Sequence, residues 1–230
     1  NKKSINSLLP SNIKSLEDKR FSIIHTDEFI SMNDDIISAL RTKKKSSMRL
    51  SINSVKDKRA DACVSAGNTG ALMALSKIIL KMIDGIDRPA ICTALPTKKG
   101  YMHMLDLGAN IECDANNLYQ FSIMGAALVQ SLEISNSPRI GLLNIGSEDF
   151  KGNETIKNAG ILLQKSNINY SGFVEGDDIF SGNFDVIVTD GFAGNIALKS
   201  IEGVANVISH FIKTEFKKNL YNKFSALISY

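Results

Sequence analysis

The chain has 230 residues, of which 43% are hydrophobic and 22% charged, and its formal net charge is +3. The composition is typical of a globular protein, the length allows one large α/β domain or two small ones, and so small a net charge gives no support to nucleic-acid binding. We find no signal peptide and no apolar run of roughly 18 to 20 residues, so we expect a cytoplasmic protein that can still touch a membrane surface. The three cysteines lack CxxC spacing, which argues against a zinc site.

The first 60 residues show little regular pattern. Residues 21–25 (FSIIH) fit a strand, and a basic run over 41–47 (RTKKKSS) precedes Met48. We interpret this run as the solvated end of a helix in preference to a docking surface for an acidic partner.

From residue 61 onward, strand-like and helix-like segments alternate. The pattern predicts strands over 61–65, 102–107, 139–145, 170–174 and 184–189, and helices over 69–83, 115–132, 153–166 and 195–220. Such alternation is typical of an α/β fold with a mainly parallel sheet covered by helices on both faces. Because no linker divides the chain, we predict a single α/β domain over 1–230, with 205–230 as a long amphipathic helical arm.

Four apolar runs end in a glycine-containing turn. Two of these turns nearly repeat each other, SAGNTG at 65–70 and TDGFAG at 189–194, and the others are DLGAN at 106–110 and NIGSE at 144–148. A strand that passes through such a turn into a helix presents free backbone N–H groups, where the helix dipole favours negative charge. Since ligands of parallel α/β folds bind at the carboxyl ends of the strands, the turns predict an anion site, with phosphate as the first candidate. For any single polar residue there, helix capping is the competing explanation.

Several common catalytic motifs are absent from the sequence. It contains no G-x-G-x-x-G, no Walker A sequence and no G-x-S-x-G, and His25, His103 and His210 stand in unremarkable contexts. A decarboxylating hydroxy-acid dehydrogenase would need an arginine cluster for its substrate, and the arginines are scattered. The residues alone therefore favour an anion-binding protein without a catalytic triad.

Six strings together resemble one family, the acyl carrier protein:phosphate acyltransferases of bacterial phospholipid synthesis. They are SAGNTGALM (65–73), GIDRPA (85–90), LDLGAN (105–110), IMGAA (123–127), PRIGLLNIGSEDFKGNE (138–154) and TDGFAGNIALKSIEG (189–203). The resemblance extends over roughly residues 21–205. The family's opening Asp-Ala-Met-Gly-Gly-Asp turn and its C-terminal portion do not occur in this sequence, so we expect part of the site to lie outside it.

The resemblance implies transfer of a long-chain acyl group from acyl carrier protein to inorganic phosphate, without a cofactor or metal. The product, an acyl phosphate, would be consumed by a membrane glycerol-3-phosphate acyltransferase. The implied fold is the three-layer α/β sandwich of the isocitrate and isopropylmalate dehydrogenases, and the implied assembly is a homodimer.

The expected site combines the four turns. We predict that phosphate attacks the thioester directly, that the backbone N–H groups of 67–70 and 191–195 bind phosphate and oxyanion, and that a covalent route through Ser65 or Cys63 is the alternative. The residues predicted to be catalytic are Asn68, Lys151 and Asn195. The residues predicted to bind substrate are Ser65, Gly67, Thr69, Gly70, Asp106, Asn110, Asn144, Ser147, Asp190, Gly191 and Gly194.

Two other functions remain open from the sequence. One is a phosphate acetyltransferase-like enzyme that uses acyl coenzyme A, and the other is a non-catalytic module that docks on a carrier protein or a membrane. The apolar stripe of the last helix favours a core or dimer interface, with an amphipathic helix on anionic lipid as the alternative.

Overall fold

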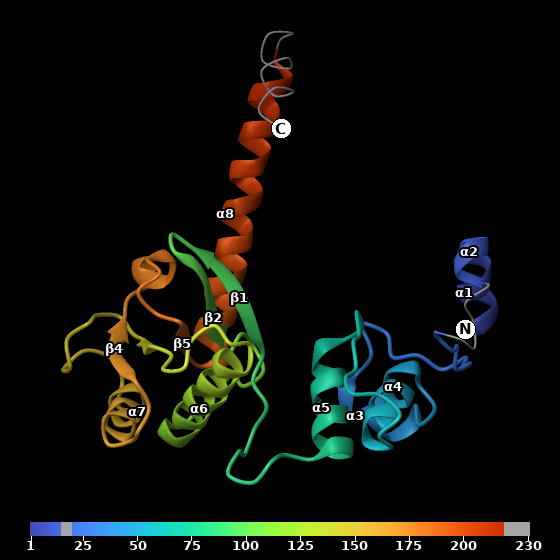
Figure 1. The fold of residues 1–230 in the computed structure, drawn as a ribbon, viewed down its shortest axis with the longest axis horizontal. Coiled ribbons are helices and arrows are strands. Elements are labelled where there is room, and N and C mark those ends of the chain that lie inside the picture. The colour runs from blue at the N-terminus through green and yellow to red at the C-terminus, as the bar shows by residue number, and fades with distance from the viewer. Residues whose placement is uncertain (15–19, 219–230) are drawn as a thin grey trace. The chain divides into compact units, whose positions relative to one another are not determined.

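The computed structural model describes residues 1–14 and 20–218, and the chain divides into two compact units, 1–89 and 90–230. Figure 1 shows the elements of each unit. The prediction of a single domain stays a prediction, and the predicted helical arm lies partly outside the described residues, because 219–230 are not among them.

In the described part of unit 1, the regular elements are helices joined by irregular chain. Its helices are α1 (Lys2–Leu8), α2 (Ser11–Lys14), α3 (Ile36–Thr42), α4 (Ser47–Lys56) and α5 (Thr69–Leu80). Helices α3, α4 and α5 enclose a core that includes Ile52, Ala71 and Leu75, all with no exposed surface. The fold of this unit is thus set by packing among three short helices.

The strands predicted over 21–25 and 61–65 are wrong. Phe21 forms only an isolated bridge, and 61–65 is irregular chain that runs into the turn before α5. Cys63 packs against the helical core, whereas Val64 is 93% exposed. Only the partly buried Cys63 thiol of this segment thus contacts the core, and among the described residues of unit 1 the segment has no neighbouring strand to pair with.

Unit 2 contains the sheet. Its elements are β1 (Cys92–Thr97), β2 (Gly100–Leu105), α6 (Ala115–Ser131), β3 (Ile140–Leu143), α7 (Glu154–Gln164), β4 (Tyr170–Val174), the 3-10 helix η1 (Gly176–Phe180), β5 (Val186–Val188) and α8 (Gly191–Lys217). The strand order is β1-β2-β5-β3-β4, with β1 antiparallel to β2 and the other neighbours parallel. The predicted α/β class with a mainly parallel sheet is confirmed.

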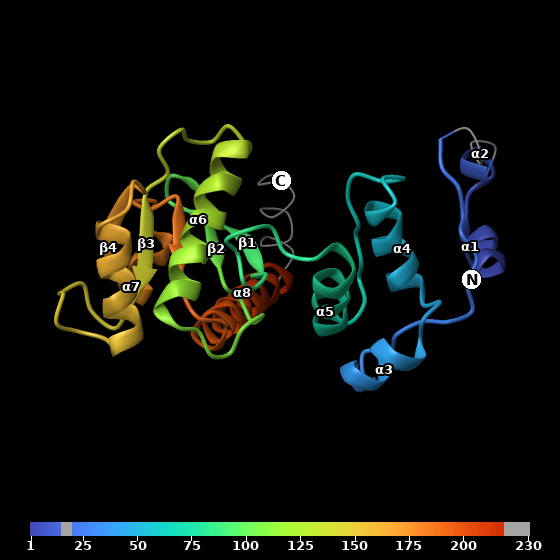
Figure 2. The ribbon, with the colours of Figure 1, turned by 90° about the horizontal axis from the view of Figure 1, so that it is seen from below.

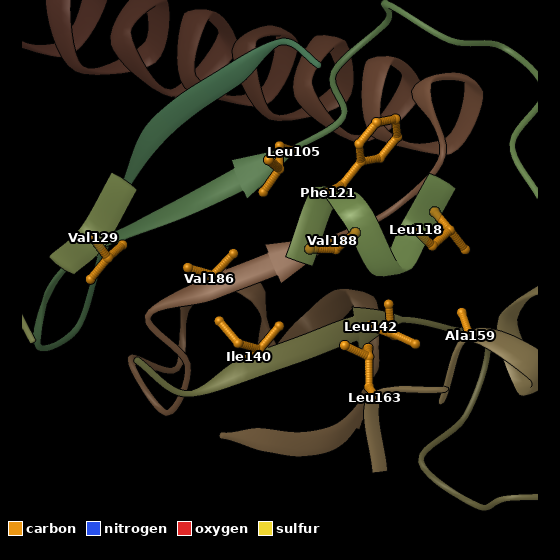
Figure 3. Packing of buried hydrophobic residues seen from close by; sticks show 10 residues of the cluster. All are labelled: Leu105, Leu118, Phe121, Val129, Ile140, Leu142, Ala159, Leu163, Val186 and Val188. Atoms are coloured by element: carbon orange, nitrogen blue, oxygen red, sulfur yellow. The ribbon is translucent and has the colours of Figure 1, made fainter. Parts of the chain in front are cut away.

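The sheet of unit 2 is covered on both faces. On one face, Val186 and Val188 of β5 pack with side chains of α6 and α7, as Figure 3 shows for ten buried residues. On the other face, Ile187 packs with side chains from the first half of α8. Neighbouring strand residues point to opposite faces, so this short β-branched strand is buried on both sides. Figure 2 shows the helices around the sheet from below.

Strand β1 was not predicted from the sequence. It contains Pro96, which lacks a backbone N–H and is normally confined to edge strands. The strand lies at the edge of the sheet and pairs only with β2, so the proline is tolerated there. Among the described residues, no helix is both long and apolar enough to cross a membrane.

An ion pair joins the starts of β3 and β5. The Arg139 guanidinium donates to both carboxylate oxygens of Asp185, at 2.8 and 3.0 Å, and the Arg139 backbone N–H adds a third bond at 2.8 Å. The side-chain hydrogen bonds from Arg139 lower the pKa of the Asp185 carboxyl. A carboxyl whose pKa is lower in the folded state stabilises the fold above its unfolded pKa, and this stabilisation disappears as the pH falls through the folded pKa.

We therefore expect Asp185→Asn to lower the free energy of unfolding by about 1 to 2 kcal/mol at neutral pH. The difference from the wild type should shrink as the pH falls below about 4, where the wild-type carboxyl also becomes neutral. Denaturant titrations at a series of pH values measure this, with the exposed Asp177→Asn as the control. A difference that does not change with pH would contradict it.

Candidate functional site

Three helices of unit 2 begin at the carboxyl ends of the parallel strands. Each is capped by a side chain: Asp114 accepts from the Asn117 N–H at the start of α6, Asn153 caps α7, and Asp190 caps α8. Residues at all three helix starts line one cavity of about 260 Å³. Its lining consists of Ile111, Glu112, Cys113, Leu118, Asn153, Thr155, Ile156, Asp190 and Phe192. The N-termini of three helices border this cavity, and their dipoles favour an anionic ligand, whereas the lining carboxylates of Glu112 and Asp190 oppose one.

Asp106 organises the turn that follows β2. It has no exposed surface, and its Oδ1 accepts from the backbone N–H groups of Ile91 (2.9 Å) and Ala109 (3.0 Å). Its Oδ2 accepts from the backbone N–H (2.7 Å) and side-chain Nδ2 (2.8 Å) of Asn110. Both oxygens are thus used within the chain. We interpret Asp106 as the residue that shapes this turn, and a contact with substrate stays a prediction.

The start of α8 is packed against the same turn. The Gly191 N–H donates to the Asn110 carbonyl oxygen at 2.8 Å, and Gly194 lies so close to the Asp106 carbonyl that a Cβ there would overlap the oxygen. The Asn195 side chain lies against Gly108, whose φ of +123° suits glycine. The structure thus brings four predicted site residues, Asp106, Asn110, Gly191 and Gly194, together with Asn195.

The amides at the start of α8 are largely occupied. The Gly191 N–H donates to Asn110, the Ala193 N–H donates to the Asp190 carboxylate at 2.8 Å, and the Gly194 N–H donates to the Asp190 carbonyl at 3.0 Å. These contacts favour the capping interpretation for Asp190. They leave fewer donors in 191–195 for phosphate than the sequence predicts.

The loop over 144–152 is built around Asn144. This side chain is buried, and its Nδ2 donates to the carbonyl oxygens of Gly146 (3.0 Å) and Lys151 (3.1 Å), which holds the loop in a tight curve. The Ser147 N–H donates to the Glu175 carboxylate at 3.2 Å. The Asn144 Oδ1 is buried and has no hydrogen-bond partner among the described residues. The loop thus carries Asn144, Ser147 and Lys151 on one short segment.

Lys151 forms an ion pair within this loop. Its Nζ lies 2.9 Å from a carboxylate oxygen of Glu148, and this hydrogen bond raises the pKa of the Lys151 ammonium. The ammonium therefore stays charged at neutral pH while remaining partly exposed to solvent. A charged, partly exposed ammonium group of this kind is able to bind an anionic ligand.

The remaining predicted residues lie in unit 1, at the start of α5. Asn68 caps this helix, because its Oδ1 accepts from the Ala71 N–H at 3.0 Å while its Nδ2 donates to the Met32 carbonyl at 3.1 Å. The Gly67 N–H donates to Ser65 Oγ at 3.2 Å. Thr69 begins α5, and Gly70 packs against Ile36 of α3. Both ends of the Asn68 amide are used, which favours capping over catalysis.

Unit 1 has a cavity of its own beside this turn. It measures about 320 Å³ and is lined by Ile30, Ser47, Met48, Ser51, Val64, Ser65, Ala66 and Gly67. The predicted site residues thus form two groups, one in each unit. The idea that 65–70 and 189–194 are parts of one site stays a prediction.

Sequence reasoning missed two sets of lining residues. Asn153 and Thr155 line the unit 2 cavity, and Ser47 and Ser51 line that of unit 1. A signal existed for both, since Asn153 followed by Glu154 and the Ser46-Ser47 pair are typical of helix starts. Within residues 1–14 and 20–218, no group of three or more His, Cys, Asp or Glu side chains is placed to hold a metal ion.

The fold of the chain is similar to that of a solved α/β protein. It is similar to the EutD phosphotransacetylase from Staphylococcus aureus, with a TM-score of 0.62 and 17% sequence identity, over 90% of this chain and 73% of that one. At this level of identity, the likeness concerns the fold alone.

The family model described as "Fatty acid synthesis protein" matches residues 1–230, and the chain belongs to this family. A relative named phosphate acyltransferase, from Methylococcus capsulatus, is 55% identical over 210 residues, which are 91% of this chain and 62% of the relative. A second of the same name, from Vesicomyosocius okutanii, is 52% identical over 229 residues, which are 100% of this chain and 68% of the relative. The chain thus spans roughly two thirds of the length of these relatives.

Proposed function

We propose that the protein transfers a fatty acyl group from acyl carrier protein to inorganic phosphate, giving an acyl phosphate for phospholipid synthesis. The observation that carries this proposal is the meeting of three helix N-termini at one cavity, in a chain whose relatives are named phosphate acyltransferase. Helix N-termini favour phosphate and also a developing oxyanion. Acyl transfer to phosphate requires that the phosphate is bound and that the oxyanion is stabilised.

The proposed chemistry is a direct displacement. A phosphate oxygen attacks the thioester carbonyl carbon, the tetrahedral oxyanion collapses, and the C–S bond breaks to release the carrier thiolate, which then takes up a proton. Inorganic phosphate is partly a dianion at neutral pH, so no strong base is needed. In this proposal the cation is Lys151, from the loop over 144–152.

The site residues are proposed in two roles. Lys151 would offset the charge of phosphate, while Asn195 and Asn68 would orient the reactants. The substrate-binding group is proposed as Ser65, Gly67, Thr69, Gly70, Asp106, Asn110, Asn144, Ser147, Asp190, Gly191 and Gly194. The contacts described above support a shaping role for Asp106 and Asn144 within this group.

We expect Lys151→Gln to lower kcat/KM for phosphate about 10- to 100-fold, because one cation facing an anionic transition state is lost. Lys157→Gln is the matched control, since Lys157 also pairs with a glutamate three residues earlier, Glu154 at 3.2 Å. Acyl phosphate formation at varied phosphate concentration measures both. Equal values of kcat/KM for phosphate in the two variants would show that Lys151 does not contribute to phosphate binding or transfer.

The exposed apolar side chains of α8 bear on the assembly of the protein and on its place in the cell. In the described part of α8, exposed apolar side chains form a stripe consisting of Val204, Val207, Ile208, Phe211, Ile212 and Phe216. We propose that this stripe packs against a second copy of the chain, in a cytoplasmic homodimer. Contact with the membrane surface, and with a membrane glycerol-3-phosphate acyltransferase that consumes the product, belongs to the same proposal.

A further inference from the structure

The turn between α3 and α4 in unit 1 carries a cluster of cations. Four carboxylates precede this turn within the segment 27–45, and each contacts another group of the chain. Asp27 contacts His25, the Glu28 carboxylate accepts from the Lys45 N–H, Asp34 pairs with Lys43, and Asp35 caps α3. By contrast, no carboxylate among the described residues forms an ion pair with the side chain of Arg41, Lys44 or Lys45. Within the described part of the chain, these three exposed cations therefore have no ion-pair partner.

Large apolar side chains lie exposed in the same segment. Phe29 and Met32 are each 65% exposed, and Ile37 is 62% exposed. The Lys43 ammonium lies 5.6 Å from the centre of the Phe29 ring. We call the six residues Arg41, Lys44, Lys45, Phe29, Met32 and Ile37 the basic surface. Exposed apolar groups beside exposed charges are typical of surfaces that bind proteins.

The basic surface is connected to the predicted site of unit 1. Helix α4 begins at Ser47, directly after the basic turn, and Ser47 and Ser51 line the same cavity as Ser65. The Met32 carbonyl accepts a hydrogen bond from the Asn68 side chain. A macromolecule bound at the basic surface would therefore stand next to the cavity at the start of α5.

We infer that the basic surface binds an acidic protein, and that this protein is the acyl carrier protein of the proposed reaction. The inference rests on the proposed function for the identity of the partner, and on charge complementarity for its chemistry. Exposed carboxylates of Asp27, Glu28 and Asp35 lie in the same segment. They would repel a uniformly anionic lipid surface, whereas a protein with fixed charges can avoid them. The mixed charges therefore favour a protein over a membrane.

The test is charge reversal of these three cations. We expect the triple variant Arg41→Glu, Lys44→Glu, Lys45→Glu to raise KM for acyl carrier protein thioester at least about 10-fold at low salt, where attraction between exposed charges is strongest. Its kinetics with a small thioester, acyl-N-acetylcysteamine, should equal those of the wild type. The matched control is Lys56→Glu, Lys58→Glu, Lys81→Glu, which makes the same change in net charge at exposed positions of the same unit.

Binding is measured separately from activity, by calorimetry with acyl carrier protein at about 50 and about 300 mM salt. We expect wild-type binding to weaken about 10-fold or more between these salt concentrations, and the reversed variant to bind weakly at both. Circular dichroism melting shows whether the variants are folded, and the same positions changed to glutamine provide a milder second variant. An absence of activity with every thioester, with binding intact, would sink the proposed function and leave the inference standing.

Two results would overturn the inference. One is wild-type affinity for the carrier protein in both the glutamate and the glutamine variants. The other is unchanged carrier affinity combined with lost binding to phosphatidylglycerol vesicles, which would assign the surface to lipid.

Discussion

Replacing Gly194 with alanine is expected to destabilise the protein by about 3 kcal/mol or more and to abolish activity, because the new methyl group has no space. A Cβ at this position would overlap the Asp106 carbonyl oxygen and would lie 2.8 Å from Thr189 Cγ2. The oxygen belongs to the backbone, so no side-chain rotation relieves the overlap. The start of α8 would have to move away from the turn over 106–110, which separates two parts of the candidate site.

The control for this substitution lies further along the same helix. A Cβ added at Gly203 would meet no atom of the described residues within 4 Å, so Gly203→Ala should stabilise the helix by about 0.5 to 1 kcal/mol. Denaturant unfolding followed by circular dichroism compares the two variants. If Gly194→Ala is as stable as Gly203→Ala, the close packing of α8 on this turn is not a feature of the protein.

The second large effect is expected for Asp106→Ala, with a loss of at least about 3 kcal/mol in the free energy of unfolding. This change removes the acceptor of four hydrogen bonds, three from backbone N–H groups and one from the Asn110 side chain. Asp106 itself has no exposed surface, so water cannot readily replace the carboxylate. Asp106→Asn should also destabilise, since its amide would direct an NH₂ group at N–H donors.

Asp114→Ala is the matched control for Asp106. Asp114 stands at the same edge of the sheet, but it is exposed and caps α6 through the Asn117 N–H, at 2.7 Å. Loss of such a cap costs about 1 kcal/mol. Thermal and denaturant unfolding of the two alanine variants should therefore differ clearly. Equal losses would show that the buried network adds nothing beyond an ordinary cap.

Local sequence pattern was sufficient for most of the sheet. Strands β2, β3, β4 and β5 are apolar runs that end in turns, and the helices after β2 and β3 begin within two residues of their predicted starts. Helix α8 begins at Gly191 instead of 195, because Asp190 caps it and the glycine turn is its first turn. Sequence pattern gave the wrong secondary structure where tertiary contacts determine it, as for the edge strand β1 with Pro96 and for residues 61–65.

The candidate site was predictable in part. That polar turns gather at the carboxyl ends of β2, β3 and β5 follows from the topology of a parallel sheet. That Asp106 accepts four hydrogen bonds, or that Gly194 contacts its carbonyl, depends on how α8 packs on a turn some 80 residues earlier. Sequence pattern carries no information on such a contact. The structure shows that Asn68 caps α5, and the catalytic role predicted for it stays a prediction.

The most direct test of the proposed function is the formation of acyl phosphate. The purified protein is incubated with a long-chain acyl carrier protein thioester and isotopically labelled inorganic phosphate, and the labelled acyl phosphate is separated from free phosphate by extraction into organic solvent and measured. We predict that labelled acyl phosphate and free carrier thiol appear in equal amounts, and only when phosphate is present. Thiol release without acyl phosphate, or acyl phosphate formed from acyl coenzyme A but not from the carrier thioester, would contradict the account.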